Sequence, residues 1–234
     1  MIGVIGGMGP LATADFLNKV IAAIPAEHDE QHVPLLISND PRIPRRPAAI
    51  LEGGESPLPR LRNIRDRLLA AGATALVMPC NTAHHWHADL SADCMVPFPS
   101  IIDVACDAAA ARTLHGARIG LVATRATLAS GLFERALAAR GRHLVVPADS
   151  VLDSAMLPAI AHVKAGRLAQ AGPLMVSAVQ SLLDQGTHLV ILACTEAPIA
   201  MASASGGIAG SCVDSTQALA LATVALWHDM RERA

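Results

Sequence analysis

The sequence predicts an α/β protein built on parallel sheets, and three observations support that class. Short aliphatic runs alternate with stretches whose apolar residues recur every three or four positions, which is the spacing of an amphipathic helix. The runs are apolar throughout, as is typical of strands covered by helices on both faces. Hydrophobic residues make up 52% of the 234-residue chain and aromatic residues only 2%, so the core is aliphatic.

The expected elements can be located in order along the chain. Strands are predicted at the aliphatic runs 2–5, 33–37, 75–78, 118–123, 143–146 and 188–192. The helical spacing is clearest over 58–71, 128–140 and 174–184. Ser56 ahead of Pro57 predicts a helix start, because serine caps helices and proline suits their first position. Helix ends are predicted at three glycines, Gly72, Gly141 and Gly186.

An internal repeat indicates how the chain is organised. Segments 68–80 and 182–194 share a Leu-Leu pair, a glycine, an aliphatic run and a cysteine, all at an offset of 114 residues. Residues 100–103 resemble 211–214 at an offset of 111, and residues 2–5 resemble 119–122 at an offset of 117. Three matches in the same order predict two similar lobes related by a pseudo-twofold axis.

We expect residues 1–100 and the C-terminal helix 215–234 in the first lobe, and residues 101–214 in the second, with the active site in the cleft between them. The alternative is one doubly wound domain with accidental internal similarity.

The composition excludes several classes of protein. A largely apolar chain with a formal net charge of −2 is neither disordered nor a basic binder of nucleic acid or membranes. The longest uncharged stretch, 197–213, is broken by proline, glycine and serine, so no membrane span is predicted. Five cysteines at wide spacings do not suggest a disulfide framework. With no signal peptide visible at the start, MIGVIGG, we expect a reducing cytoplasm.

Two cysteines occupy equivalent positions of the repeat, Cys80 in MPCNTAH and Cys194 in LACTEAP. Each follows an expected strand and precedes an expected helix, so each thiol would lie where α/β sheets bind ligands and where a helix N-terminus favours thiolate. Opposed thiols suit inversion at a carbon, because one removes a proton and the other delivers a proton to the opposite face. We expect both to be catalytic, although most free cysteines are small core residues. We expect Cys94, Cys106 and Cys212 to be core residues of that kind.

Polar residues follow each of these cysteines directly. Asn81 and Thr82 come after the first, and Thr195 and Glu196 after the second. Their side chains and backbone N–H groups can hold a carboxylate.

Several motifs together resemble a known family. They are MIGVIGGMGPLATADF, SNDPRIPRR, MPCNTAH, ATxxTxxSG at 123–131, VKAG and ACTE. In this order, over nearly the whole chain, they are similar to the aspartate/glutamate racemases that do not use pyridoxal phosphate (PLP), and to the aspartate racemase branch in particular.

The resemblance implies a cofactor-independent racemase, usually a homodimer, that interconverts L- and D-aspartate or a related acidic amino acid. Cys80 and Cys194 would be the acid/base pair. The residues that would bind substrate are Arg46, Asn81, Thr82, Thr124, Thr127, Lys164, Thr195 and Glu196. Of these, Asn81, Thr82 and Thr195 would hold the α-carboxylate and amino group, and Arg46 and Lys164 the side-chain carboxylate. Glu196 would support the second thiol or contact the amino group.

Composition agrees with part of this expectation. A PLP racemase needs a Schiff-base lysine, and the chain has only Lys19 and Lys164, neither in a convincing cofactor site. Lys19 is expected on the exposed face of the first helix. Without the family, Lys164 would be read as a solvated residue at a helix end, and Arg46 as a loop residue able to grip a carboxylate bidentately.

The chain departs from the family pattern at two loops. Arg45 and Pro47 stand where the family usually has Asp and Thr, and Arg125 and Ala126 replace a small Thr-Gly pair. An added cation beside Arg46 would broaden or move the preference among acidic substrates.

Two further motifs are compatible with other functions. The loop GMGPLA at 7–12 fits a dinucleotide-binding pattern, but the expected acidic residue, Asp40, comes too late, and close approach to a small anion explains the glycines better. The motif HHWH at 84–87 invites a metal site, yet no fourth ligand is evident, and one histidine tuning the Cys80 thiol fits better. A binding protein could lose a catalytic cysteine, whereas both are present. The serious rival is a decarboxylase or maleate-isomerase-like enzyme of the same superfamily.

Overall fold

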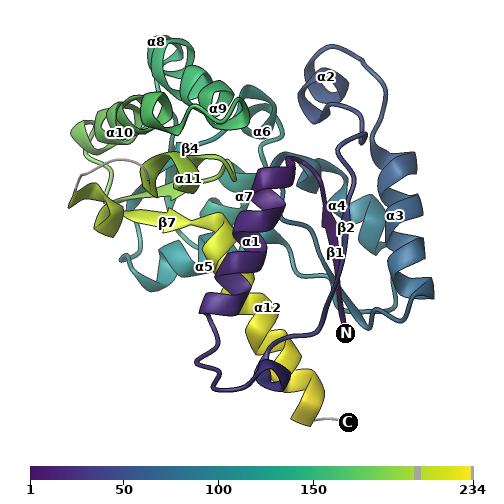
Figure 1. The fold of residues 1–234 in the computed structure, drawn as a ribbon. Helices are drawn as coiled ribbons and strands as arrows, with labels where there is room; N and C mark the ends of the chain where they lie inside the picture. The colour runs from purple at the N-terminus through teal and green to yellow at the C-terminus, as the bar shows by residue number, and fades with distance from the viewer. Residues whose placement is uncertain (203–206, 233–234) are drawn as a thin grey trace. The chain divides into compact units, whose positions relative to one another are not determined.

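The structure is a computed structural model, and it describes residues 1–202 and 207–232. The chain divides into two compact units, shown in Figure 1. The first comprises Met1–Val104 and Thr216–Ala234, and the second Ala105–Ser215, so the division falls within helix α5 (Ile101–Ala111).

The first unit is built on a three-stranded parallel sheet. Its strands are β1 (Ile2–Gly6), β2 (Leu35–Asn39) and β3 (Ala75–Val77), in the order β2-β1-β3. Its helices are α1 (Pro10–Ala22), α2 (Arg46–Leu51), α3 (Leu58–Ala70), α4 (His87–Ser91) and α12 (Ser215–Glu232), with 3-10 turns η1 (Asp29–Gln31) and η2 (Thr82–Trp86). Helix α3 packs on β1 and β2.

The second unit has a four-stranded parallel sheet. Its strands are β4 (Arg118–Val122), β5 (His143–Val145), β6 (Leu189–Leu192) and β7 (Cys212–Asp214), in the order β5-β4-β6-β7. Its helices are α6 (Arg125–Ala129), α7 (Leu132–Ala139), α8 (Asp149–Val151), α9 (Leu157–Lys164), α10 (Leu168–Asp184) and α11 (Ala197–Ala202). A π-helical turn η3 (Leu152–Met156) precedes α9, and a 3-10 turn η4 (Gly207–Ser211) precedes β7.

The predicted α/β class with parallel sheets is confirmed, and each predicted strand overlaps an observed one. Two elements differ from the prediction beyond their exact ends. The helix expected over 128–140 is two helices, α6 and α7, because Gly131 adopts a left-handed φ of 64° between them. Strand β7 is absent from the predicted strands, since only two apolar residues, Cys212 and Val213, stand between Ser211 and Asp214. Residues 203–206 of the expected second lobe and 233–234 of the C-terminal helix lie outside the described residues.

The repeat is visible in how the central strands pack. In the first unit a Cβ on Gly3 of β1 would lie 3.2 Å from Leu68 Cβ and 2.9 Å from Leu76 Cδ2. In the second unit a Cβ on Gly120 of β4 would lie 3.1 Å from both Leu182 Cβ and Val190 Cγ2. Leu68 and Leu182, like Leu76 and Val190, are the pairs offset by 114 residues. Each glycine therefore lets a helix pack closely on its sheet.

One of the three sequence matches does not join equivalent elements. Residues 101–103 begin helix α5, whereas 212–214 form strand β7, so the match of 100–103 with 211–214 is misleading. At the offset of 114 residues, α5 and α12 both begin in register, at Ile101 and Ser215. In the first unit the position of β7 is taken by a proline-containing segment, whose Pro97 carbonyl accepts the Leu76 N–H at 2.9 Å. Proline interrupts strand pairing there.

The three helix ends predicted at glycines are confirmed. Gly72, Gly141 and Gly186 follow α3, α7 and α10 with left-handed φ angles of 93°, 65° and 78°. The predicted helix start is off by one residue, because Pro57 is the N-cap of α3 and not its first residue, while Ser56 Oγ accepts the N–H of Leu58 at 3.3 Å. Across 1–202 and 207–232, no helix combines the length and apolar character that a membrane crossing requires.

Candidate active site

Cys80 lies in the turn that follows strand β3. The side chain is buried, with 5% of the residue exposed, and it belongs to the apolar cluster of the first unit with Met78 and Ala83. The Cys80 N–H donates to the Met78 carbonyl at 2.8 Å, which turns the chain sharply at the carboxyl end of the sheet. The element that follows is the short 3-10 helix η2, so the full α-helix N-terminus expected beside this thiol is absent.

His84 holds the Cys80 turn in place. Its Nδ1 lies 2.8 Å from the Cys80 carbonyl oxygen, and its Nε2 accepts the Ile101 N–H at 3.0 Å. Because Nε2 is an acceptor, the proton of the neutral ring is on Nδ1 and is donated to Cys80. Burial lowers the pKa of His84 to about 3, with a smaller contribution from His87, so the ring is neutral. His84 therefore contacts the backbone of Cys80, and the expected tuning of the thiol stays a prediction.

The other histidines of HHWH also have local roles. The rings of His84 and His87 stack with centroids 5.0 Å apart, and His87 Nε2 lies 2.9 Å from the Phe98 carbonyl. His85 is exposed. Among the described residues, no group of three or more His, Cys, Asp or Glu side chains is arranged to hold a metal ion.

Arg46 is the first residue of helix α2, not a loop residue as the sequence suggested, because Pro47 fits the first helical turn. Its Nη1 donates to the carbonyls of Ile43 and Pro44, each at 3.0 Å. The side chain is half-buried, and helix α2 contacts η2, which directly follows Cys80 and Asn81. Two backbone acceptors thus fix one edge of the guanidinium in advance, which suits it to bidentate binding of a carboxylate.

The loop before Arg46 is shaped by Asp40. This buried carboxylate accepts hydrogen bonds from the N–H and Nε of Arg42 and from the guanidinium of Arg60. Those bonds hold the pKa of Asp40 well below its usual range. A Cβ on Gly7 would lie 2.3 Å from the Asp40 carbonyl oxygen. Gly7 is therefore needed for a close approach to the protein's own backbone, and the approach of this loop to a small anion stays a prediction.

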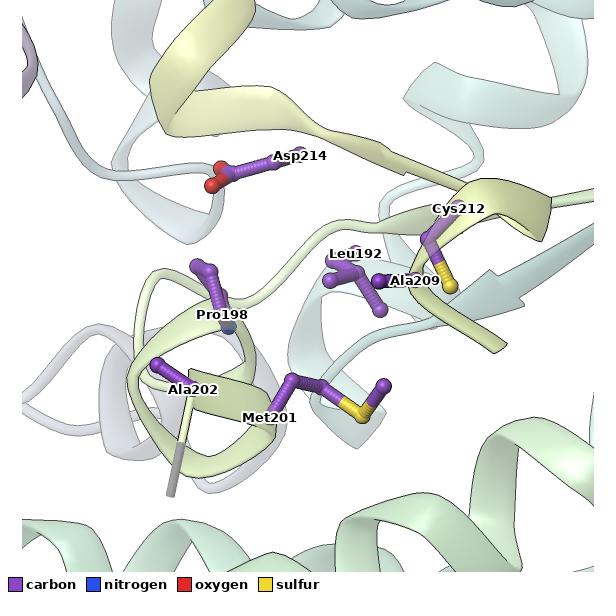
Figure 2. Close-up of a pocket in the computed structure, with 7 residues that line it drawn as sticks. All are labelled: Leu192, Pro198, Met201, Ala202, Ala209, Cys212 and Asp214. Atoms are coloured by element: carbon purple, nitrogen blue, oxygen red, sulfur yellow. The ribbon is translucent and has the colours of Figure 1, made fainter. Parts of the chain in front are cut away.

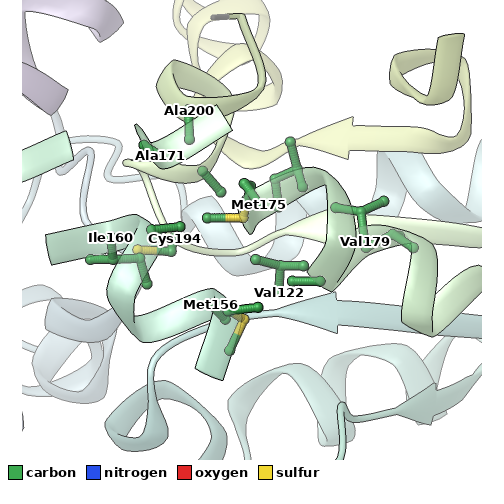
Figure 3. Close-up of a cluster of buried hydrophobic side chains, with 14 of the residues drawn as sticks. Val122, Met156, Ile160, Ala171, Met175, Val179, Cys194 and Ala200 are labelled. Carbon is green, nitrogen blue, oxygen red and sulfur yellow. The ribbon is translucent and has the colours of Figure 1, made fainter. Parts of the chain in front are cut away.

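Cys194 lies at the equivalent place in the second unit, two residues after β6, and is also 5% exposed. Figure 3 shows it among apolar side chains that include Ile160 and Met175. Its Sγ donates to Glu196 Oε2 at 3.0 Å, and Thr195 Oγ1 donates to the same oxygen at 3.4 Å. Burial raises the pKa of Cys194 well above its usual value, and the Glu196 carboxylate adds to the rise. Burial and the Glu196 carboxylate therefore outweigh the N-terminus of helix α11, which was expected to favour the thiolate.

Lys164, the last residue of α9, completes this cluster. Its Nζ lies 3.6 Å from Glu196 Oε1, the oxygen that Cys194 does not use. The Lys164 side chain is 58% exposed and that of Glu196 7% exposed, so the lysine covers the solvent side of a buried carboxylate. The sequence did not reveal this pair, because 32 residues separate them; the one available signal was a Glu two residues after a cysteine.

Thr124 and Thr127 form a cap at the carboxyl end of β4. Thr124 is the N-cap of α6, where its Oγ1 accepts the Thr127 N–H at 3.3 Å and lies 3.1 Å from Thr127 Oγ1. Arg125 is ion-paired with Asp149 at 2.9 Å and Asp153 at 2.7 Å. The charge of this unusual arginine is therefore balanced within the second unit.

A small cavity, of about 250 Å³, lies at the carboxyl ends of β6 and β7. Figure 2 shows its lining: Leu192, Pro198, Met201, Ala202, Ala209, Cys212 and Asp214. None of the predicted site residues lines it. The Cys212 thiol donates to the Ile208 carbonyl at 3.5 Å, and burial raises its pKa to about 11, so it is a thiol at neutral pH.

The predicted site residues thus form two groups, one within each unit. In the first unit Cys80, Asn81 and Thr82 are consecutive, and Arg46 begins a helix that contacts the same turn. In the second unit Cys194, Thr195, Glu196 and Lys164 form one contact network, and Thr124 and Thr127 form another pair.

Comparison with known proteins identifies the family. Over residues 5–223 the chain matches the family model described as Asp/Glu/Hydantoin racemase. It is similar to the solved structure of Picrophilus torridus aspartate racemase, with a TM-score of 0.85 and 29% identity, covering 97% of this chain and 94% of that one.

Two curated relatives are also similar. The broad specificity amino-acid racemase RacX of Bacillus subtilis is 24% identical over 241 residues, which cover 97% of this chain and 98% of that protein. A glutamate racemase of Beutenbergia cavernae is 31% identical over 176 residues, 70% of this chain but only 55% of that protein. With a family model matched over nearly its whole length, the chain belongs to the Asp/Glu/hydantoin racemase family.

Proposed function

We propose that this amino-acid racemase of the Asp/Glu family interconverts L- and D-aspartate without a cofactor, with Cys80 and Cys194 as the two acid/base groups. The aspartate specificity is supported by the similarity to a protein named an aspartate racemase. The curated relative named a broad specificity amino-acid racemase supports activity on further amino acids.

One observation carries the two-cysteine proposal. Cys80 and Cys194 follow equivalent strands of two sheets with the same core order, β2-β1-β3 and β5-β4-β6, and both are 5% exposed. Two equivalent thiols, one from each lobe, suit a reaction whose forward and reverse directions are mirror images. We propose that substrate binds in a cleft between the lobes, with one thiol on each face of Cα.

The substrate's charged groups have matching partners on the chain. We propose that Arg46 and Lys164 hold the side-chain carboxylate, since these are cations presented from half-buried or exposed positions. Asn81, Thr82 and Thr195 would hold the α-carboxylate and the amino group, and Thr124 and Thr127 would line the same cleft. Fixed hydrogen-bond donors around the α-carboxylate would stabilise charge that develops on it when Cα loses its proton.

The chemistry proposed is a direct proton exchange. A thiolate takes the α-proton from one face, and the opposite thiol gives a proton to the other face, so the proton count of the substrate is unchanged. In the structure Lys19 is ion-paired with Asp15 and Lys164 with Glu196.

The test is incubation with L- or D-aspartate in deuterated water without added PLP. We expect loss of optical activity together with deuterium at Cα of the product. Absence of both changes with aspartate, glutamate and close analogues contradicts the proposal. Release of CO2 from a dicarboxylate, or conversion of maleate to fumarate, would support the rival enzyme class instead.

A further inference from the structure

The contacts around Glu196 form a chain that runs from solvent to the Cys194 sulfur. Lys164 Nζ lies 3.6 Å from Oε1, and Cys194 Sγ donates to Oε2 at 3.0 Å, so the two carboxylate oxygens serve different partners. Lys164 is the exposed member and Glu196 and Cys194 are buried. A substrate anion arriving from solvent would therefore meet Lys164 before it meets the carboxylate.

The position of the Cys194 proton depends on how well Glu196 is stabilised as an anion. With Lys164 nearby, the negative charge is favoured on the carboxylate, and the proton stays on sulfur. Among the described residues, the charged groups that act on this thiol are Glu196, which raises its pKa, and Lys164, which lowers it by a smaller amount. Because Lys164 contacts the carboxylate directly and acts only weakly on the thiol, removing it raises the proton affinity of Glu196 more than that of the thiolate and brings the two closer.

We propose that Lys164 couples recognition of the substrate's side-chain carboxylate to activation of Cys194. The incoming carboxylate draws Lys164 away from Glu196, and Glu196 then takes the thiol proton. In this step the Sγ–H bond breaks, an Oε2–H bond forms, and the electron pair stays on sulfur as the thiolate that attacks the α-proton. The proton remains within the buried pair, so no proton is released to solvent.

With this coupling, the charge of the substrate's side chain affects the rate of turnover as well as the affinity. Asparagine has nearly the shape of aspartate but a neutral side chain, so it leaves Lys164 on Glu196 and Cys194 stays protonated. The inference rests on the proposed function, because it assigns the same site a carboxylate-dependent switch.

The test measures exchange of the α-proton with deuterated water in a Cys80→Ala variant, where Cys194 acts alone and can return deuterium to the face it deprotonated. Both enantiomers of aspartate and asparagine are used at saturation, and the exchange is followed by NMR. Adding Lys164→Met removes the cation from Glu196 with either substrate. We expect asparagine exchange to rise about tenfold, and the preference for aspartate at saturation to fall.

Two further variants show whether the gain depends on Lys164 and on Glu196. Lys19→Met removes the only other lysine and is expected to change neither rate. Adding Glu196→Gln to Lys164→Met is expected to abolish the gain on asparagine. An unchanged or slower asparagine exchange in Lys164→Met, in a protein with normal circular dichroism, overturns the coupling and leaves the proposed function standing. Failure of the unmodified enzyme to racemise or exchange aspartate overturns both.

Discussion

The two catalytic candidates occupy equivalent places in the two units, and different side chains contact the turn that carries each of them. Cys80 is held through its backbone carbonyl by a neutral histidine, His84. Cys194 is bonded through its thiol to a carboxylate, Glu196, which in turn contacts Lys164. The strand that positions each cysteine is equivalent, whereas the side chains that hold the two turns differ. A repeated backbone thus places two similar groups, and different local side chains hold them.

The first test of this comparison removes each thiol in turn. Cys80→Ala and Cys194→Ala are each expected to lower the rate of aspartate racemisation by about a thousandfold or more, because each removes a group that transfers a proton. Chiral chromatography of the product measures the rate. Cys94→Ala, the matched control on a half-buried cysteine outside the site, is expected to retain activity. Full activity in either catalytic variant contradicts the assignment.

The second change separates the charge at one thiol from its position. Glu196→Gln is expected to lower racemisation about a hundredfold, since the acceptor of the thiol proton is lost. The same change is expected to lower the pKa of Cys194, because the carboxylate raises that pKa in addition to burial. Thiol alkylation against pH measures the second effect. A lower pKa with undiminished activity would show that Glu196 only impedes the thiol.

The third change tests the support of Cys80. His84→Ala leaves the Cys80 carbonyl and the Ile101 N–H without their partner, and we expect a loss of about 1–3 kcal/mol in the free energy of unfolding. Denaturant melts measure it, with the exposed His85→Ala as the control. An equal effect of the two substitutions contradicts the role of His84.

The same histidine predicts a pH dependence. Its pKa in the folded chain is about 3, below the ordinary value of 6.5, so the unfolded chain binds more protons as the pH falls between these values. The stabilisation is complete above pH 6.5 and decreases as the pH falls toward 3. His84→Ala is expected to have a shallower loss of stability between pH 7 and pH 5 than the parent, measured by denaturant melts at each pH. A parallel loss would indicate that other groups control the slope.

The smallest effects concern the shared backbone. Gly3→Ala is expected to cost about 1–3 kcal/mol of stability, and Gly120→Ala less, because the new Cβ would lie 2.9 Å from its nearest neighbour in the first unit and 3.1 Å in the second. Amide hydrogen exchange within each unit measures the two effects separately. A larger cost at Gly120 would reverse the expected order.

Much of the fold could be read from the sequence because its signals are local. Continuous aliphatic runs located β1, β4 and β6, and the glycines after α3, α7 and α10 marked the helix ends. Strand β7 could not be located, since its two apolar residues between Ser211 and Asp214 form no continuous aliphatic run. The proline-containing segment beside β3 shows the converse limit: a position equivalent to a strand can be filled by a segment that has no strand pattern.

The sequence predicted the parts of the candidate site whose residues are neighbours in the chain. The repeat identified Cys80 and Cys194 together with their polar neighbours. The Lys164–Glu196 contact and the link from His84 to Ile101 were not predictable, because both depend on how distant segments pack. The expectation of a thiolate at Cys194 also failed, since burial beside a carboxylate outweighs a six-residue helix.

The account depends on two thiols that act on opposite faces of one carbon. The most direct measurement follows α-proton exchange in deuterated water for L- and D-aspartate with each single-cysteine variant. A lone thiol can remove a proton and return deuterium only on its own face, so Cys80→Ala and Cys194→Ala are expected to exchange opposite enantiomers without inversion. Exchange of the same enantiomer by both variants would contradict the account.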